Sequence, residues 1–150
     1  MLKEAEVTVF VDGVLNYFNN AVNHAAVCGT PFLALEQQPE ISDYTGMIQV
    51  SGKRNGVVLF TAPKTMLSVM LMRMQEPDMC HENLCDLVGE IANTLSGNAR
   101  RDFGSQFNIS VPEVLSGKSS TIDYPAGARP IVIPIDWRNY HARLVVCLNS

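Results

Sequence analysis

The sequence predicts one domain of the α+β class, in which long helices pack on a mostly antiparallel sheet. The expected elements follow the order helix, strands, helix, helix, strands, which is not the alternation of a doubly wound fold. Hydrophobic residues make up 47% of the 150 residues, which suffices for a core in a chain close to the size of one ordinary domain.

The first half of the chain is expected to contain one helix and three strands. Apolar residues recur at intervals of three and four over about 5–27 and predict a helix, which a following Gly-Thr-Pro sequence ends. A short strand is expected at 32–36. The stretches at 44–52 and 55–63 predict a hairpin, because the turn SGKRNG between them is rich in turn-forming residues.

The second half is expected to contain two helices and a final hairpin. Pro63 suits the start of a helix, and the methionines and leucines after it predict a buried face. The next helix is expected over about 78–101. A short extended piece, NISV, and two strands, RPIVIPIDW and HARLVVCLN, follow it. Pro130 and Pro134 predict that one of these strands lies near a sheet edge or starts irregularly, and an unpaired edge of this hairpin is a candidate dimer surface.

Composition limits the partners and the location of the protein. The net charge is −4, from 11 basic and 15 acidic residues without long runs, which argues against a nucleic-acid partner. No stretch reaches the roughly 18 apolar residues of a membrane span, and the start, MLKEAEVTVF, does not have the pattern of a signal peptide. We therefore expect a cytoplasmic protein with reduced cysteines and no membrane partner. Cys80 and Cys85 lack the paired spacing of a metal site, so no bound metal is expected.

The helix that includes residues 82–99 is expected to have two different faces. At ~100° per residue, one side is apolar and consists of Leu84, Leu87, Val88, Ile91 and Leu95. The opposite side, within an arc of roughly 60°, consists of Asp86, Glu90, Asn93 and Gly97. This polar row contains no lysine or arginine, although solvated helices usually mix acids with long basic residues. The short side chains of this row, and the absence of one at Gly97, would let another surface approach closely. The row therefore predicts a docking face.

An earlier stretch of the sequence repeats this row. The same spacings occur 74 positions earlier in Asp12, Asn16 and Asn19. A Pro-Glu pair follows at 39–40 and again at 112–113, and two strands are expected after each pair. We interpret the pattern as a diverged internal repeat, with halves at about 5–63 and 78–149 that are related by approximate two-fold symmetry.

The motif Asp-x-x-x-Glu-x-x-Asn at 86–93, followed by Pro112, resembles the signature of the CheC/CheX/FliY phosphatases of bacterial chemotaxis. The run ENLCDLVGEIANTLSGNARRDFG, with ISVPEVLSG after it, is most similar to the CheX branch. The resemblance is specific over about 82–117 and weak in detail over 1–80. It implies a CheX/CheC-like two-layer fold with two pseudo-symmetric αβ halves, a homodimer, and dephosphorylation of a phosphorylated CheY-type response regulator.

The resemblance also implies roles for individual residues. Glu90 takes the position of the glutamate that pairs with a lysine of the regulator, and Asn93 takes that of the asparagine that orients the attacking water. Asp86 and Pro112 take the other two motif positions, and we expect them and Gly97 to face the partner. The protein then needs no cofactor of its own, because the regulator supplies its Mg²⁺ and acid pocket.

The chain departs from the family pattern at two points. Only 18 residues separate Asn93 from Pro112, which predicts a shorter helix end or a tighter loop. Asn16 stands where the second copy has Glu90, so Asn19 lacks a charged partner and is not expected to be a second catalytic amide. A single active motif fits the CheX branch, and a binding role for Asn16 and Asn19 is left open.

Two other functions are compatible with these residues. The first is a non-enzymatic binding module of a signalling or flagellar-switch assembly, which docks a partner on the 82–99 helix. The second is a small-molecule enzyme with His24 and Cys28 as a nucleophilic pair, four residues apart on the first predicted helix, although such a pair needs an orienting third group. His81 and His141 have no partner that the sequence reveals.

Overall fold

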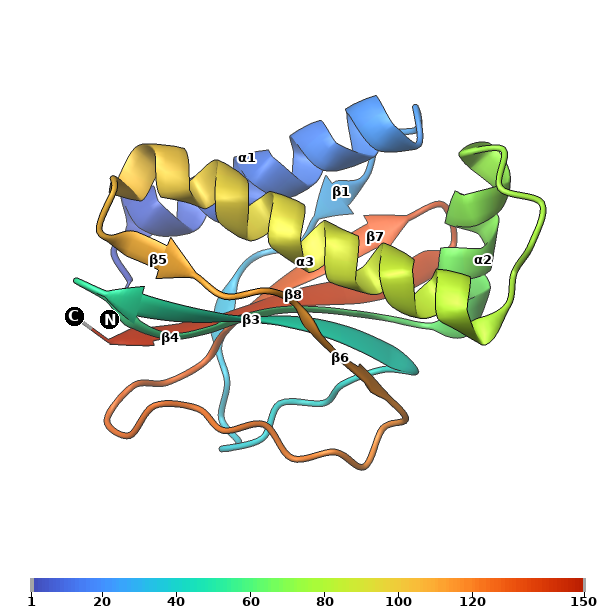
Figure 1. Cartoon of the computed structure of the whole chain (residues 1–150). Helices are drawn as coiled ribbons and strands as arrows, with labels where there is room; N and C mark the ends of the chain where they lie inside the picture. The colour runs from blue at the N-terminus through green and yellow to red at the C-terminus, as the bar shows by residue number, and fades with distance from the viewer. Residues whose placement is uncertain (1, 150) are drawn as a thin grey trace.

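The computed structural model describes residues 2–149 and shows a two-layer α+β fold, in which the helices cover one face of a single antiparallel sheet (Figure 1). The predicted fold class is confirmed. The elements are α1 (Glu4–Ala21), β1 (Val27–Cys28), β2 (Phe32–Leu33), β3 (Tyr44–Gly52), β4 (Asn55–Ala62), α2 (Lys64–Arg73), α3 (His81–Phe103), β5 (Phe107–Ile109), β6 (Glu113–Ser116), β7 (Ile131–Trp137) and β8 (Tyr140–Asn149). None of the helices in residues 2–149 has both the length and the apolar character that a membrane crossing requires.

The strand order across the sheet is β1-β7-β8-β4-β3-β5, with β2 also paired to β7 and β6 also paired to β3. The pairs between these strands are all antiparallel. If each strand from β1 to β4 is exchanged with its counterpart from β5 to β8, so that β1 becomes β5 and β3 becomes β7, the same order is obtained in reverse. This arrangement agrees with two pseudo-symmetric halves, each of which places its two short strands against the other half. The bounds of the repeat in the sequence stay a prediction.

The first helix ends at Ala21 and not near residue 27, so this boundary was wrong. The apolar period continues through Ala25, but Asn23 adopts a φ of 50°. This left-handed conformation is tolerated by asparagine and interrupts a helix. Beyond it the chain extends as β1 and pairs with the end of β7, because pairing with a distant strand overrides a local helical pattern.

The C-terminal hairpin lies inside the sheet, so its predicted free edge is wrong. β8 is flanked by β4 and β7, and the outer side of β7 is occupied by β1 and β2. Pro134 lies between these two short strands, and its carbonyl oxygen accepts a hydrogen bond from the Gly29 N–H (2.9 Å). The nitrogen and carbonyl of one strand residue point to the same side, so the missing N–H of Pro134 removes no bond to β8. The homodimer stays a prediction, and this hairpin offers no unpaired strand edge for it.

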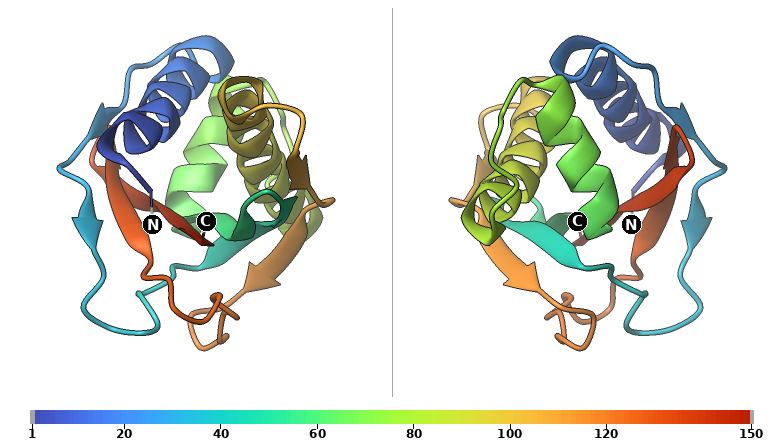
Figure 2. Two further views of the ribbon diagram at one scale, coloured as in Figure 1. Left: turned by 90° about the vertical axis from the view of Figure 1, so that its left-hand side faces the viewer. Right: turned by 90° about the vertical axis from the view of Figure 1, so that its right-hand side faces the viewer.

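The main core lies between the helices and the sheet, and a smaller apolar cluster lies on the other face. Loops cover that second face below the sheet (Figure 2). The residues buried in the smaller cluster are Ala34, Ile41, Met47, Val57, Leu59, Ile122, Val132, Val145 and Cys147. Because both faces of the central strands are covered, β3, β4 and β8 are runs of mostly buried residues rather than alternating ones.

Gly46 of β3 allows the backbone of α3 to lie directly on the sheet. A β-carbon at this position would overlap the carbonyl oxygen of Val88, and it would lie 2.7 Å from the carbonyl carbon of Val88 and 3.1 Å from the α-carbon of Gly89. Any side chain at position 46 would therefore push the helix away. The glycine fixes the height of α3 above β3, and with it the direction in which the outer face of the helix points.

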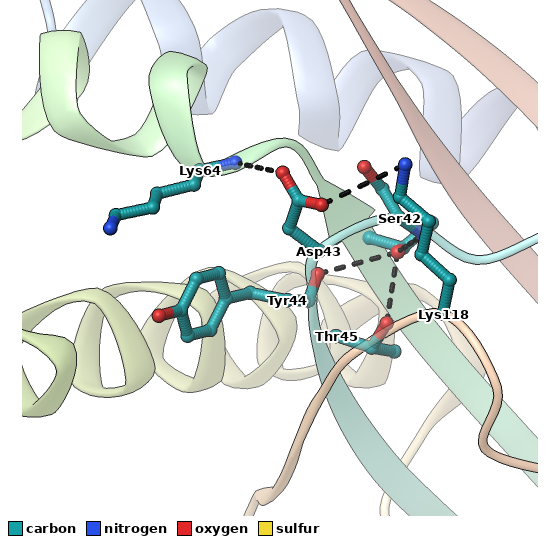
Figure 3. Close-up of polar contacts among 7 residues, drawn as sticks. Ser42, Asp43, Tyr44, Thr45, Lys64 and Lys118 are labelled. Atoms are coloured by element: carbon teal, nitrogen blue, oxygen red, sulfur yellow. Dashed lines mark hydrogen bonds and ion pairs between the residues drawn. The ribbon is translucent and has the colours of Figure 1, made fainter.

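Asp43 joins the start of β3 to two neighbouring segments (Figure 3). One carboxylate oxygen accepts a hydrogen bond from the Lys64 backbone N–H in the first turn of α2 (2.8 Å), and the other lies 3.8 Å from the Lys118 ammonium nitrogen. The Asp43 carbonyl oxygen also accepts a bond from the N–H of Gly117, just after β6 (2.8 Å). One residue thus caps α2 and fixes the end of β6.

We expect Gly46→Ala to lower the free energy of unfolding by about 3 kcal/mol or more, because the new methyl group meets backbone that cannot move aside. Gly97→Ala is the matched control, since no atom lies within 4 Å of its β-position. This change should instead raise the free energy of unfolding by about 0.5–1 kcal/mol. Urea unfolding followed by circular dichroism measures both variants. Equal midpoints would contradict the close approach of α3 to β3.

We expect Asp43→Ala to lower the free energy of unfolding by about 1 kcal/mol, the usual effect of losing a helix cap. Asp43→Asn should keep most of this stability, because the amide oxygen still accepts the Lys64 N–H. Asp123→Ala, at an exposed loop position, should stay within about 0.5 kcal/mol of the wild type. Thermal unfolding compares the three, and an unchanged Asp43→Ala would exclude the capping role.

Candidate functional site

The outer face of α3 carries the polar row that is predicted from the sequence. Asp86, Glu90 and Asn93 are exposed, and Gly97 is half-buried. The opposite side is buried and includes Leu84, Leu87, Val88, Ile91 and Leu95. Because Glu90 and Asn93 are three residues apart, their β-carbons lie about 5–6 Å from each other. A carboxylate and an amide therefore face solvent side by side.

Both ends of α3 are fixed by local hydrogen bonds. Before its first turn, the Asp78 carboxylate accepts a bond from the Cys80 N–H (3.1 Å), and the Asp78 carbonyl accepts one from the Asn83 side chain (2.9 Å). After its last turn, Gly104 has a φ of 97°, which favours glycine, and its N–H donates to the Arg100 carbonyl (2.9 Å). Between these ends the helix packs on β3 and against α1. Such a helix holds its Cα–Cβ bonds in constant directions.

After α3 the chain returns to this helix at Pro112, with only 18 residues between Asn93 and Pro112. α3 runs to Phe103, so the loop and not the helix is short. β5 pairs with the end of β3 and β6 with its start. Gly89 makes room for the return: a β-carbon there would lie 3.4 Å from the Pro112 β-carbon and 3.2 Å from a Val114 methyl carbon. Pro112 is itself exposed and lies beside the row.

Two apolar residues next to the row are not found by sequence reasoning. Val111 is 82% exposed and Val114 is 36% exposed, on either side of Pro112. The alternation in Val-Pro-Glu-Val is a weak strand signal, but four residues do not reveal the strand with which they pair. Together with Pro112, the two valines give this side of the row an exposed apolar surface, which another protein could cover.

The first copy of the row lies on α1, where Asp12, Asn16 and Asn19 are exposed. α1 and α3 lie side by side on the same face of the sheet (Figure 1, Figure 2). A β-carbon at Gly13 would lie 3.7 Å from the Leu95 side chain of α3. This copy therefore presents amides to solvent, with no carboxylate at the position that corresponds to Glu90.

The hypothesis of a nucleophilic His24–Cys28 pair is wrong. The two residues do not share a helix, because α1 ends at Ala21 and Cys28 belongs to β1. The His24 ring instead packs edge-on against the buried Trp137, with 5.6 Å between the ring centroids. Burial of Cys28 and the nearby Asp136 carboxylate raise the pKa of this thiol to about 11. At neutral pH it is therefore a protonated thiol and a weak nucleophile.

The other two histidines have partners that the sequence does not reveal. His81 Nδ1 lies 2.9 Å from the Tyr44 hydroxyl oxygen, and His81 Nε2 lies 3.5 Å from the Cys85 sulfur. His141 Nδ1 pairs with the Asp136 carboxylate. Within residues 2–149, no three histidine, cysteine, aspartate or glutamate side chains are grouped as a metal ion would require. Both histidines thus make contacts within the fold.

The row on α3 can bind and orient a partner, but it contains no nucleophile. The Glu90 carboxylate can accept a charge-assisted hydrogen bond from a cation. The Asn93 amide can donate and accept hydrogen bonds without carrying charge, so it can hold a water molecule beside a negatively charged group. This arrangement fits catalysis by positioning, in which a partner supplies the reacting group.

A family model described as "Chemotaxis phosphatase CheX" matches residues 44–136. None of the curated proteins that were compared matches the chain in sequence.

Solved structures match almost the whole chain. A CheC-like superfamily protein from Shewanella sp. PV-4 is 25% identical over 99% of this chain and 100% of its own, with a TM-score of 0.85. The chemotaxis protein CheX from Vibrio vulnificus is 23% identical over 97% and 99%, with a TM-score of 0.84. A CheX-CheY-BeF3-Mg²⁺ complex from Borrelia burgdorferi contains a chain that is 14% identical over 97% and 98%, with a TM-score of 0.79.

Proposed function

The chain belongs to the CheX family of chemotaxis phosphatases, and from this premise we propose that it hydrolyses the aspartyl phosphate of a CheY-type response regulator. The observation that carries the proposal is the exposed pair of Glu90 and Asn93, on a helix that lies directly on the sheet. The structural neighbour in complex with CheY supports a partner of the same type.

In the proposed reaction, Asn93 positions the attacking water. The water oxygen forms a bond to phosphorus while the bond from phosphorus to the aspartyl oxygen breaks on the opposite side. The regulator's aspartate is left as a carboxylate, the water oxygen leaves in inorganic phosphate, and the released proton passes to solvent or phosphate. An amide can accept a bond from the water, and unlike a carboxylate it does not repel the phosphoryl oxygens. Positioning of this kind can remove several kcal/mol of the barrier, and each ~1.4 kcal/mol is tenfold in rate.

Glu90 anchors α3 in the regulator's active site in this proposal. Its carboxylate accepts a charge-assisted hydrogen bond from the lysine that the family resemblance implies. The Mg²⁺ belongs to the regulator, where it neutralises charge on the phosphoryl group. This chain therefore supplies an anchor and an amide, while the regulator supplies the metal ion and the acid pocket.

The surroundings of the pair suit the entry of a partner. Gly97 has no atom within 4 Å of its β-position, so it leaves space above the last turns of α3. Pro112 and Val111 offer exposed apolar surface at the side of the row. Asp86 extends the row by one turn toward the start of the helix. We propose that these residues contact the regulator around the catalytic pair.

We expect Asn93→Ala to slow phosphate release from a phosphorylated CheY-type regulator by at least about tenfold, the effect of ~1.4 kcal/mol of lost positioning. The side chain is exposed, so the fold should be unaffected. Asn19→Ala is the matched control, because it removes the corresponding amide of α1, which has no neighbouring glutamate. This control should retain the wild-type rate.

Equal turnover by the wild type and Asn93→Ala would refute the catalytic assignment. The alternative, a non-enzymatic binding module that docks on α3, predicts a different result. In that case the regulator binds the wild type but keeps its phosphoryl group for as long as it does alone. A pull-down combined with the phosphate-release assay separates the two functions.

We expect Gly97→Gln to obstruct docking without disturbing the fold. The absence of atoms within 4 Å gives the new side chain room in this protein, and glutamine is a better helix former than glycine. The KM for the phosphorylated regulator should rise by about tenfold or more, which corresponds to ~1.4 kcal/mol of lost contact. Asn20→Gln, at an exposed position of α1, should leave the KM unchanged. An unchanged KM in Gly97→Gln would place the partner elsewhere.

A further inference from the structure

The phenol hydroxyl of one tyrosine on α1 is buried without a hydrogen-bond partner. Tyr17 of α1 is 7% exposed, and its hydroxyl oxygen is buried with no partner among residues 2–149. A buried hydroxyl without an acceptor is unfavourable, and a phenylalanine would fill the same space without this penalty. The oxygen of Tyr17 therefore needs an explanation beyond packing.

The packing of α1 against α3 places this hydroxyl near Glu90. The helices run in opposite directions: the ring of Phe10 lies 5.8 Å from that of Phe103, and the β-position of Gly13 lies 3.7 Å from Leu95. Tyr17 is one turn further along α1 than Gly13, and the antiparallel packing therefore places it opposite the turn of α3 that contains Glu90.

The electrostatics of Tyr17 agree with this placement. Burial raises the pKa of the Tyr17 phenol, and the negative charge of Glu90 raises it further. The carboxylate is thus within electrostatic reach of the phenol, although the two side chains make no hydrogen bond in this structure. Glu90 is exposed and free to change its rotamer.

We propose that Tyr17 is a positioning residue, whose hydroxyl donates a hydrogen bond to Glu90 when the carboxylate turns toward α1 to meet the regulator. The inference rests on the proposed function of Glu90 as an anchor. A carboxylate has about four acceptor sites, so it can accept the phenol and a lysine of the partner together. An exposed glutamate loses rotamer freedom when it binds, and a second hydrogen bond offsets part of that loss.

The device serves only one of the two polar rows. Tyr17 belongs to the first copy of the repeat, and its counterpart 74 positions later is Ile91, which has no hydroxyl. In the other direction, the residue that corresponds to Glu90 is Asn16, which is not a carboxylate. The helix without the full motif therefore supplies a donor to the helix that has it.

The test compares binding of a CheY-type regulator, held in its beryllium-fluoride complex with Mg²⁺, by wild type and Tyr17→Phe. This substitution removes one oxygen and keeps the ring. We expect the Kd to rise about threefold to tenfold, the range for a hydrogen bond to a charged group that is partly offset by solvent. The KM for the phosphorylated regulator should rise in parallel with little change in kcat. The thermal midpoint should stay equal or increase, because an unsatisfied hydroxyl is lost.

Two further variants make the test specific. Tyr124→Phe is the matched control, because the Tyr124 hydroxyl is also buried without a partner, but it packs against the smaller apolar cluster on the other face of the sheet. Its Kd should equal that of the wild type. In a Glu90→Ala background, Tyr17→Phe should produce no additional change in Kd.

Three results would overturn the inference. The first is an unchanged Kd in Tyr17→Phe, and the second is an equal loss of binding with and without Glu90, since the phenol would then act on the fold alone. The third is a regulator that the wild type does not bind, which contradicts the proposed function as well. If Asn93→Ala stops phosphate release while Tyr17→Phe changes nothing, only the role of Tyr17 fails.

Discussion

The close approach of β3 and α3 at Gly46 is the constraint on which the functional face depends. The helix lies so near the strand that the backbone of Val88 and Gly89 occupies the space of a β-carbon. This contact fixes the rotation of α3, so that its apolar side faces the sheet while Glu90 and Asn93 point outward. Gly89 of α3 allows a second close approach, since its missing side chain lets Pro112 and Val114 pack beside the row. Two glycines thus determine both the direction and the border of the site.

The two halves of the fold share a topology but differ in how their helices are used. The strand order is symmetric under exchange of the halves. However, the backbone of α3 lies directly on Gly46 of β3, whereas the β-position of Gly13 in α1 meets only the Leu95 side chain of α3. α1 also lacks a carboxylate at Asn16. We infer that α1 supports α3 and does not act as a second active helix. In the proposal above, this support includes a hydrogen bond from the buried Tyr17 phenol to Glu90.

Local patterns predicted those elements that periodicity and turn chemistry determine. The two faces of α3 follow from leucines at helical spacing, and the β3–β4 hairpin follows from its glycine-rich turn. The end of α1 could not be predicted in this way, because the pairing of β1 with a strand more than a hundred residues away decides it. The strand β6 and the position of Val111 could not be predicted for the same reason, because they also depend on pairing with a strand that is distant in the sequence. The contact of Gly46 with α3 could not be predicted either, since a glycine in a strand does not indicate which backbone will lie against it.

The central claim is that Glu90 and Asn93 of α3 enter the active site of the regulator, and the structure of the complex tests it most directly. The measurement is a crystal structure of the protein bound to a CheY-type regulator in its beryllium-fluoride form with Mg²⁺. We predict that α3 enters the regulator's active site, with the Asn93 amide about 3 Å from a water in line with the beryllium centre and Glu90 against a lysine. A complex in which the regulator binds α1 or the loop-covered face, with Glu90 and Asn93 left in solvent, would contradict the account.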